Sequence, residues 1–305
     1  DYTNDLPKMK VPLNYFINLI IRPLMLKILS LTLYRKNLKN LGKFDIIYVF
    51  NNYHSYLFGL SESIIGSNHI HLGHKLFLKL ISFNILFPNI KAMHLFPHNL
   101  NYAKYLGRKK IISIPNGVDT NLFYPNVNYN QNKLRILFVA RLEREKGVDM
   151  VLEVYKSLGL DSELYIVGNG TLKDKVDNFA KNNQSVHSLG IVSENELAEI
   201  YRNCDIFLYP TQSDQFPLVI MEALASGLKV ITTKLLESVY NEFEQFNAIR
   251  FCSYNKEELI SAIKEMSKVK IEKVALKSYI DKKYSWEQVS KKLFAAILQI
   301  SQKTL

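Results

Sequence analysis

The stretch DIFLYPTQSDQFPLVIMEALASGLKVITT, residues 205–233, constrains the fold more than any other part of the chain. Asp205–Tyr209 and Lys229–Thr233 are short apolar runs rich in β-forming residues, which predicts two strands. The segment between them has a helical composition, with Pro217 suited to the first helical position and Gly227 suited to the stop. The stretch therefore predicts a strand, a loop, a helix and a second strand.

Two carboxylates lie within this predicted unit. Asp214 is in the loop before the helix, and Glu222 follows eight residues later inside it. Both are expected near the carboxyl ends of the strands, which is the edge where open α/β sheets bind ligands. Taken alone, such a pair also fits a solvated loop residue and an exposed helix face. The rest of the chain decides between the two interpretations.

The second half of the chain alternates strand-like and helix-like segments. We expect further strands at 135–140, 163–167, 186–191 and 249–252, and helices at 148–158, 172–182, 194–203 and 256–268. Repeated βα units at this spacing predict a parallel, doubly wound sheet. In the first half, strands are expected at 44–50 and 110–114.

The acid-x7-acid spacing, with Phe216 between the acids and EALASG after them, resembles the E-x7-E motif of retaining glycosyltransferases of family 4. Those enzymes have the GT-B fold, so the resemblance implies two Rossmann-like doubly wound parallel-sheet domains with an interdomain cleft. This copy departs from the motif at two positions. Asp214 replaces the usual Glu, and Pro217 stands where Gly is usual.

Two further motifs carry the same resemblance. The run IPNGVD at 114–119 is similar, letter for letter, to the family's exit from the N-terminal domain. Arg141 and Lys146-Gly147 resemble the family's R-x4-K-G. The resemblance implies an acceptor-side domain at 1–127 and a nucleotide-sugar-binding domain at 128–305, with a last helix at 285–303 crossing back. The first domain is expected to be short or truncated, because the family's first strand and glycine-rich acceptor loop have no counterpart.

The resemblance also implies how a nucleotide-diphospho-sugar donor is held. Glu222 would hold the ribose hydroxyls, Asp214 the donor sugar, and Arg141 with Lys146 the diphosphate. Fixed cations suit that last role, because the leaving nucleoside diphosphate gains negative charge as the glycosidic bond breaks. The remaining donor-binding residues that the resemblance implies are Gly168, Gly170, Val192, Phe216, Leu218 and Val219. No protein nucleophile is evident, which favours front-face attack assisted by the leaving phosphate.

Three histidines, His69, His71 and His74, lie close together in the first half. No carboxylate or cysteine nearby completes a metal site, so no metal is expected. The resemblance implies that His71 or His74 faces the reaction centre. It implies no cofactor beyond the donor substrate itself.

Charge is concentrated in the first half of the chain. Residues 1–129 hold 15 Lys and Arg against 5 Asp and Glu, whereas residues 130–305 hold 24 against 23. This asymmetry indicates an anionic partner such as a membrane surface, a phosphorylated acceptor or a nucleic acid, with ordinary solubilising lysines as the alternative. The resemblance favours the first two partners and no nucleic acid. The apolar run at 15–34 fits an interfacial segment or a helix packed on its own domain.

Cys204 and Cys252 lie in apolar stretches and indicate neither a disulfide framework nor a metal cluster. A reducing compartment and the absence of a legible signal peptide predict a cytoplasmic protein, with peripheral association at the cytoplasmic face of the membrane.

The expected function is transfer of a sugar, of hexosyltransferase type, to a lipid-linked or glycan acceptor with retention of configuration. Two alternatives stay open at this point. A GT-B sugar-nucleotide epimerase would need further catalytic acids and histidines in the second half, where only His187 is present. A nucleotide-sugar-binding remnant would bind donor without turnover.

Overall fold

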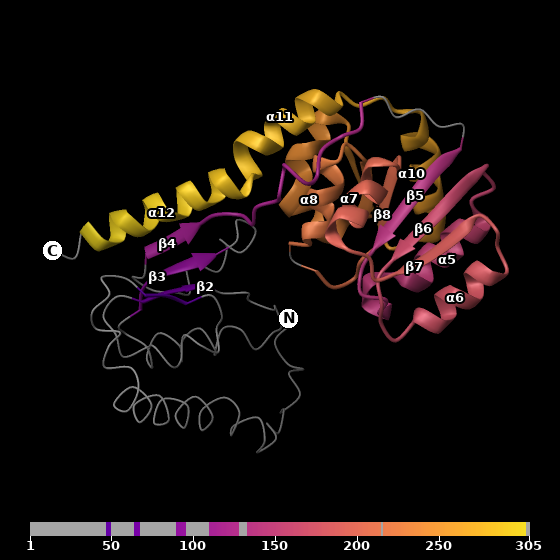
Figure 1. Ribbon diagram of the computed structural model, residues 1–305, viewed down its shortest axis with the longest axis horizontal. Helices are drawn as coiled ribbons and strands as arrows, with labels where there is room; N and C mark the ends of the chain where they lie inside the picture. Colours follow the sequence, from indigo (N-terminus) through magenta and orange to yellow (C-terminus); the bar gives the residue numbers. More distant parts are fainter. Residues whose placement is uncertain are drawn as a thin grey trace, which may run out of the picture. The chain divides into compact units, whose positions relative to one another are not determined.

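The computed structural model describes short strands in the first part of the chain and nearly all of the second part (Figure 1). The described residues are 47–49, 64–67, 90–95, 110–127, 133–214 and 216–302. The chain divides into two compact units, one formed by 1–114 with 292–305 and the other by 115–291. The predictions for residues 15–34, His71 and His74 lie outside the described residues.

The first unit contains a four-stranded parallel sheet of order β1-β2-β3-β4. Its strands are β1 Ile47–Val49, β2 Ile64–Ser67, β3 Ile90–Leu95 and β4 Lys110–Ser113. The strands predicted at 44–50 and 110–114 are confirmed as β1 and β4. The sequence analysis missed β2 and β3, where Gly66, Lys91 and His94 interrupt the apolar runs.

The second unit contains a six-stranded sheet of order β10-β9-β8-β5-β6-β7, in which every pairing is parallel. Its strands are β5 Leu134–Val139, β6 Ser162–Val167, β7 Val186–Gly190, β8 Ile206–Tyr209, β9 Lys229–Thr233 and β10 Ile249–Cys252. All six were predicted to within one or two residues. The prediction of a doubly wound parallel sheet is therefore confirmed for this unit.

Helices cover both faces of this sheet (Figure 1). The helices of this unit are α5 Val148–Ser157, α6 Lys173–Lys181, α7 Glu194–Arg202, α8 Leu218–Ala225, α10 Lys256–Lys268 and α11 Lys273–Tyr284. Helix α12 Trp286–Gln302 follows α11, and its residues from 292 onward belong to the first unit. Helix α5 packs beside α10, whereas α8 packs beside α7 and α11. The change of face follows from right-handed crossovers that run from β5 towards β7 and from β8 towards β10.

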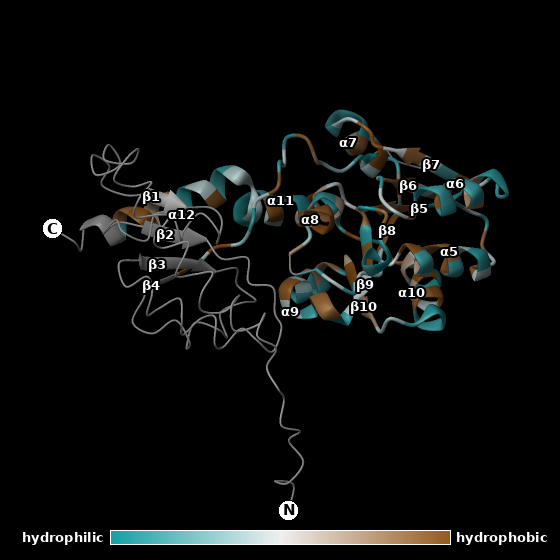
Figure 2. Ribbon diagram, turned by 90° about the horizontal axis from the view of Figure 1, so that it is seen from below, coloured by the Kyte–Doolittle hydropathy of each residue, from teal (hydrophilic) through white to brown (hydrophobic). Residues whose placement is uncertain are grey.

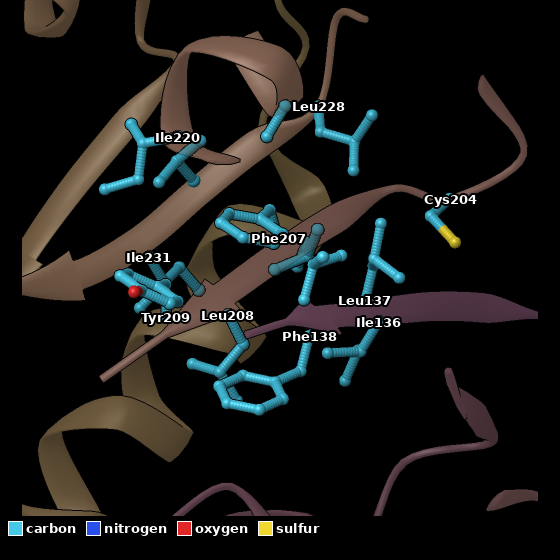
Figure 3. Packing of buried hydrophobic residues seen from close by; sticks show 14 of the residues in the cluster. Ile136, Leu137, Phe138, Cys204, Phe207, Leu208, Tyr209, Ile220, Leu228 and Ile231 are labelled. Carbon is cyan, nitrogen blue, oxygen red and sulfur yellow. The ribbon is translucent and has the colours of Figure 1, made fainter. Parts of the chain in front are cut away.

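The core lies on both faces of the central strands, and α8 covers one of these faces (Figure 3). Phe138 on β5 and Phe207 on β8 are fully buried, and Ile220 of α8 packs in the same cluster. Most of α8 is hydrophobic, whereas α5 and α6 carry many hydrophilic residues (Figure 2). Because α8 is enclosed on nearly all sides, the packing that stabilises the sheet also fixes the start of this helix.

The ends of α7 and α8 are set by residues next to them in the sequence. Ser193 caps α7, because its hydroxyl accepts a hydrogen bond from the Glu196 N–H and the Glu196 carboxylate accepts one from the Ser193 N–H. Gly227 ends α8 with φ +76°, as predicted. The position assigned to Pro217 was wrong by one residue. It is the N-cap of α8, with the extended ψ of 117° that a residue outside the helix adopts.

Helix α11 was not predicted, and neither was the series η5 Lys234–Leu236, α9 Glu237–Tyr240 and η6 Asn241–Phe246. A cluster around Glu242 joins them, in which Tyr279, Lys283 and Tyr284 donate hydrogen bonds to its carboxylate. These contacts connect residues about forty positions apart, so local periodicity does not reveal them.

The second unit begins and ends at one place. Val118 forms a parallel bridge with Ser285, and its N–H donates to the Tyr284 carbonyl at 2.8 Å. A Cβ added to Gly117 would lie 2.6 Å from the Trp286 ring, so only glycine allows this packing. Within the described residues, no helix is both long and apolar enough to cross a membrane.

Candidate active site

The sheet of the second unit has a topological switch point between β5 and β8. From β5 the chain continues outward through β6 and β7, and from β8 it continues in the other direction through β9 and β10. The loops after β5 and β8 therefore leave the carboxyl edge side by side. In open α/β sheets, this position forms the ligand-binding crevice.

Glycines allow the loops at this edge to approach one another closely. A Cβ on Gly168, where φ is +135°, would lie 1.8 Å from the Ala140 carbonyl oxygen. A Cβ on Gly170 would lie 2.7 Å from the Leu142 N, and one on Gly147 would lie 2.1 Å from the Pro210 carbonyl oxygen. The loops after β5, β6 and β8 are therefore in main-chain contact, which no other residue type would permit.

The closest ionic contact at the switch point joins Lys146 to Asp214. The Lys146 Nζ lies 2.8 Å from each carboxylate oxygen and donates to the Ser213 carbonyl at 3.1 Å. Their side chains are only 12% and 19% exposed, so the pair is mostly shielded from water. The structure brings together two residues that the sequence analysis placed in the same donor site, 68 positions apart.

Two neutral donors also hold Asp214. The Tyr209 hydroxyl donates to Oδ2 at 2.6 Å, and the Thr211 hydroxyl lies 3.0 Å from the same oxygen. The main chain beneath is fixed as well, because the Thr233 hydroxyl donates to the Thr211 carbonyl at 2.7 Å. Burial and the Asp214 carboxylate raise the pKa of Tyr209, so its hydroxyl stays a proton donor.

Glu222 lies on α8 and is half-buried. The Tyr201 hydroxyl donates to Oε2 at 3.1 Å. The pKa of Glu222 is raised to about 7, mainly by desolvation. The Tyr201 hydrogen bond lowers this pKa, and the nearby charge of Glu194 adds to the rise. A carboxyl group with this pKa changes charge near neutral pH, which is a property of functional sites more often than of structural ones.

Arg141 follows β5 and has a side chain that is 72% exposed. Its Nη2 lies 3.9 Å from a Glu145 oxygen, which is a loose ion pair that leaves the guanidinium accessible. The neighbouring Glu143 faces elsewhere, since it accepts hydrogen bonds from the Thr171 hydroxyl and N–H. Arg141 is therefore an accessible cation at the same edge as Lys146.

The remaining predicted residues lie at the start of α8 and of α7. Phe216 packs its ring 5.3 Å from that of Tyr240, Leu218 is exposed, and Val219 is half-buried. Val192 is half-buried just before the α7 cap.

Sequence reasoning missed Tyr201, Tyr209 and Thr211, which donate hydrogen bonds to the carboxylates of Glu222 and Asp214. The signal for the tyrosines was a phenol in a buried helix or strand position, because a buried hydroxyl needs a partner.

In the described part of the chain, no group of three or more His, Cys, Asp or Glu residues is arranged to hold a metal ion. Cys204 and Cys252 are free and buried. His187 lies on β7 with its ring stacked 4.6 Å from Tyr165, so it is a strand residue rather than part of the loops described above.

Comparison with known proteins identifies the family. The sequence profile of the Glycosyl transferases group 1 family matches residues 122–283. The N,N'-diacetylbacillosaminyl-diphospho-undecaprenol alpha-1,3-N-acetylgalactosaminyltransferase of Campylobacter jejuni is 27% identical over 244 residues, which cover 71% of this chain and 63% of that protein. The chain spans 35% and 54% of the length of two further curated relatives.

Solved structures show the same fold at low sequence identity. Sucrose-phosphate synthase from Thermosynechococcus elongatus aligns with a TM-score of 0.72 and 14% identity, over 97% of this chain and 82% of that chain. HepE from Anabaena, solved in complex with UDP and glucose, aligns with a TM-score of 0.65 and 14% identity, over 90% and 80%. The predicted GT-B fold is thereby confirmed. The chain belongs to the Glycosyl transferases group 1 family.

Proposed function

We propose that the protein transfers a sugar from a nucleotide-diphospho-sugar to a lipid-linked or glycan acceptor, with retention of the anomeric configuration. One observation carries the proposal. At the switch point of the second unit, interlocked loops bring Lys146, Asp214 and the start of α8 together, and Glu222 follows on that helix. Cations and helix N–H groups at this place suit a diphosphate, and a carboxylate nearby suits a ribose.

Each side chain then has a role in holding the donor. Lys146 and Arg141 bind the diphosphate, the N–H groups of Leu218 and Val219 point to the same group, and Glu222 accepts hydrogen bonds from the ribose hydroxyls. Asp214 is the residue assigned to the donor sugar. Gly168, Gly170 and Val192 are the further residues assigned to the donor, and the two glycines allow the loops after β5 and β6 to approach one another closely.

The chemistry follows from the charges. The bond between the anomeric carbon and the phosphate oxygen breaks, and the diphosphate gains negative charge that Lys146 and Arg141 stabilise. The acceptor hydroxyl forms the new bond on the same face, and its proton passes to the leaving phosphate oxygen. This course needs no protein nucleophile. One feature favours transfer over epimerisation: His187 is the one histidine of residues 130–305, and it lies on β7.

Lys146→Ala and Arg141→Ala are expected to weaken binding of a nucleoside diphosphate roughly 10- to 100-fold, because each removes a charge-assisted contact to phosphate. Binding of the corresponding nucleoside should change little. Calorimetric titration with UDP, GDP and ADP and with the matching nucleosides measures both. Lys156→Ala, an exposed lysine of α5, is the control.

Incubation with radiolabelled sugar nucleotides and a lipid extract separates the functional alternatives. Incorporation of label into lipid or glycan supports transfer. Conversion of the sugar without incorporation would indicate epimerisation, and binding without either would indicate a remnant. Equal binding of nucleoside diphosphate by the parent, Lys146→Ala and Arg141→Ala would remove the proposed diphosphate site.

We propose that the acceptor-side domain binds the cytoplasmic face of an anionic membrane. The basis is the sequence of residues 8–43, which combines the apolar run with eight Lys and Arg residues. The protein is expected to pellet with anionic vesicles and to be released as salt rises, because surface attraction is screened within about 8–10 Å. Equal pelleting with neutral and anionic vesicles at low salt would contradict the electrostatic part.

A further inference from the structure

Tyr201 is a fully buried tyrosine that lies at the back of the proposed donor site. It is on α7, and its ring packs edge-on against Phe123 at 5.6 Å and beside Phe207 at 5.8 Å. These contacts fix the ring on two sides, so the hydroxyl has a defined position. Burial raises the pKa of Tyr201 well above its usual value, which keeps the hydroxyl protonated and able to donate.

The hydroxyl of Tyr201 points at α8. It lies 3.1 Å from the Glu222 Oε2 and 3.2 Å from the Val219 carbonyl oxygen. Among the described residues, Tyr201 is the one hydrogen-bond donor to this carboxylate. A single donor on Oε2 leaves the acceptor capacity of Oε1 unused by the described residues.

We propose that Tyr201 is a positioning residue for the donor site, which holds Oε2 of Glu222 so that Oε1 accepts the ribose hydroxyls. The inference rests on the proposed function, since it assigns a supporting residue to the same site. The tyrosine would not touch the donor. It acts by fixing the rotamer of Glu222 and by favouring its charged form, because a donated hydrogen bond stabilises a carboxylate relative to the neutral acid.

The groups around Glu222 determine how strongly the Tyr201 hydrogen bond affects its ionisation. Glu194, at the first position of α7, adds a like charge that disfavours ionisation. Tyr240 is also fully buried nearby, but its hydroxyl donates to the Pro217 carbonyl at 2.9 Å. Desolvation and Glu194 therefore oppose the charged form, and the Tyr201 hydroxyl is the group that supports it. Without that hydroxyl, the pKa of Glu222 would be higher still.

Tyr201→Phe tests the inference, because it removes the hydroxyl and keeps the ring. Carboxyl carbon NMR of the ligand-free protein, with Glu222→Gln to assign the resonance, measures the pKa of Glu222. We expect that pKa to rise in Tyr201→Phe. Calorimetric titration with UDP, GDP and ADP should show about five- to tenfold weaker binding at pH 7, with the deficit narrowing at pH 9, where Glu222 is ionised in both proteins. Tyr155→Phe, which removes a hydroxyl bonded to the Ser162 carbonyl at 2.7 Å, is the control for a purely structural loss.

The outcomes separate the inference from the function on which it rests. An unchanged Glu222 pKa in Tyr201→Phe, or nucleotide binding equal to that of the parent protein at pH 7, overturns the positioning role. A parent protein that binds none of the three nucleotides overturns the proposed function, and the positioning role with it, whatever the NMR result. A raised pKa together with a pH-dependent deficit that Tyr155→Phe does not show supports both.

Discussion

Glu222→Gln is expected to be more stable than the parent protein at pH 8 by up to about 3 kcal/mol, although it removes the proposed ribose ligand. The pKa of Glu222 is about 7 in the folded protein against 4.5 ordinarily, so the folded state holds a proton that the unfolded chain releases. The stability of the parent therefore falls as pH rises through the folded pKa of about 7. Glutamine has no charge to desolvate, so the stability of the variant should not fall in this way as pH rises.

Urea unfolding at pH 5 and pH 8 measures the effect. The two proteins should be close in stability at pH 5 and should separate at pH 8. Glu153→Gln, an exposed glutamate of α5, serves as the control and should follow the parent at both pH values. Parallel pH dependence in the parent and Glu222→Gln would mean that Glu222 ionises near its ordinary pKa.

The same variant is expected to bind nucleoside diphosphate and nucleoside about 10-fold or more weakly at pH 8, because the charged acceptor for the ribose is lost. A variant that becomes more stable while losing ligand is typical of residues selected for activity against stability. Calorimetric titration of both proteins with nucleoside diphosphate and with nucleoside at pH 8 measures the loss of affinity. Unchanged affinity for both ligands would contradict the ribose role of Glu222.

Gly168→Ala is expected to lower the free energy of unfolding by about 3–5 kcal/mol and to abolish nucleotide binding. The added Cβ would lie 1.8 Å from the Ala140 carbonyl oxygen, and φ of +135° is a conformation that alanine avoids. Because both groups belong to the main chain, relief requires separation of the loops after β5 and β6. Those loops carry Arg141 and Gly170, so the site would be distorted as well.

Gly159→Ala is the matched control for this prediction. Its φ is +64°, but an added Cβ would meet nothing within 4 Å. The cost should therefore be limited to the backbone strain, about 1 kcal/mol, with ligand binding unchanged. Chemical denaturation of both variants separates strain from collision. Equal losses of stability would indicate that φ alone, and not the contact with Ala140, determines the need for glycine.

The sequence predicted the second unit well because its elements are short, alternate regularly and are marked by local signals. Ser193 caps the start of α7 and Gly227 stops α8, and both roles depend on residues only a few positions away in the sequence. Helix α11 was missed because its buried face consists of only Leu276, Ile280 and Tyr284 among lysines. Its position depends on the contacts of Glu242, which lies far away in the sequence.

The site was predicted as a set of residues but not as a geometry. Motif spacing indicated Lys146, Asp214 and Glu222, yet nothing local predicts that Lys146 Nζ contacts both oxygens of Asp214. That contact depends on the strand order, which places β8 beside β5 rather than beside β7. Tyr201 and Tyr209 were not predicted for the same reason, because packing between elements brings their hydroxyls to Glu222 and Asp214.

The bridge between Val118 and Ser285 has a consequence for how the chain is divided. The unit at 115–291 is an insertion in the other unit, which is made from two separate pieces of the chain. Because the inserted unit enters and leaves at one bridged point, its ends are already joined. Such a module can be exchanged between host chains, or opened at a surface loop and closed at its natural ends, with little cost in loop-closure entropy.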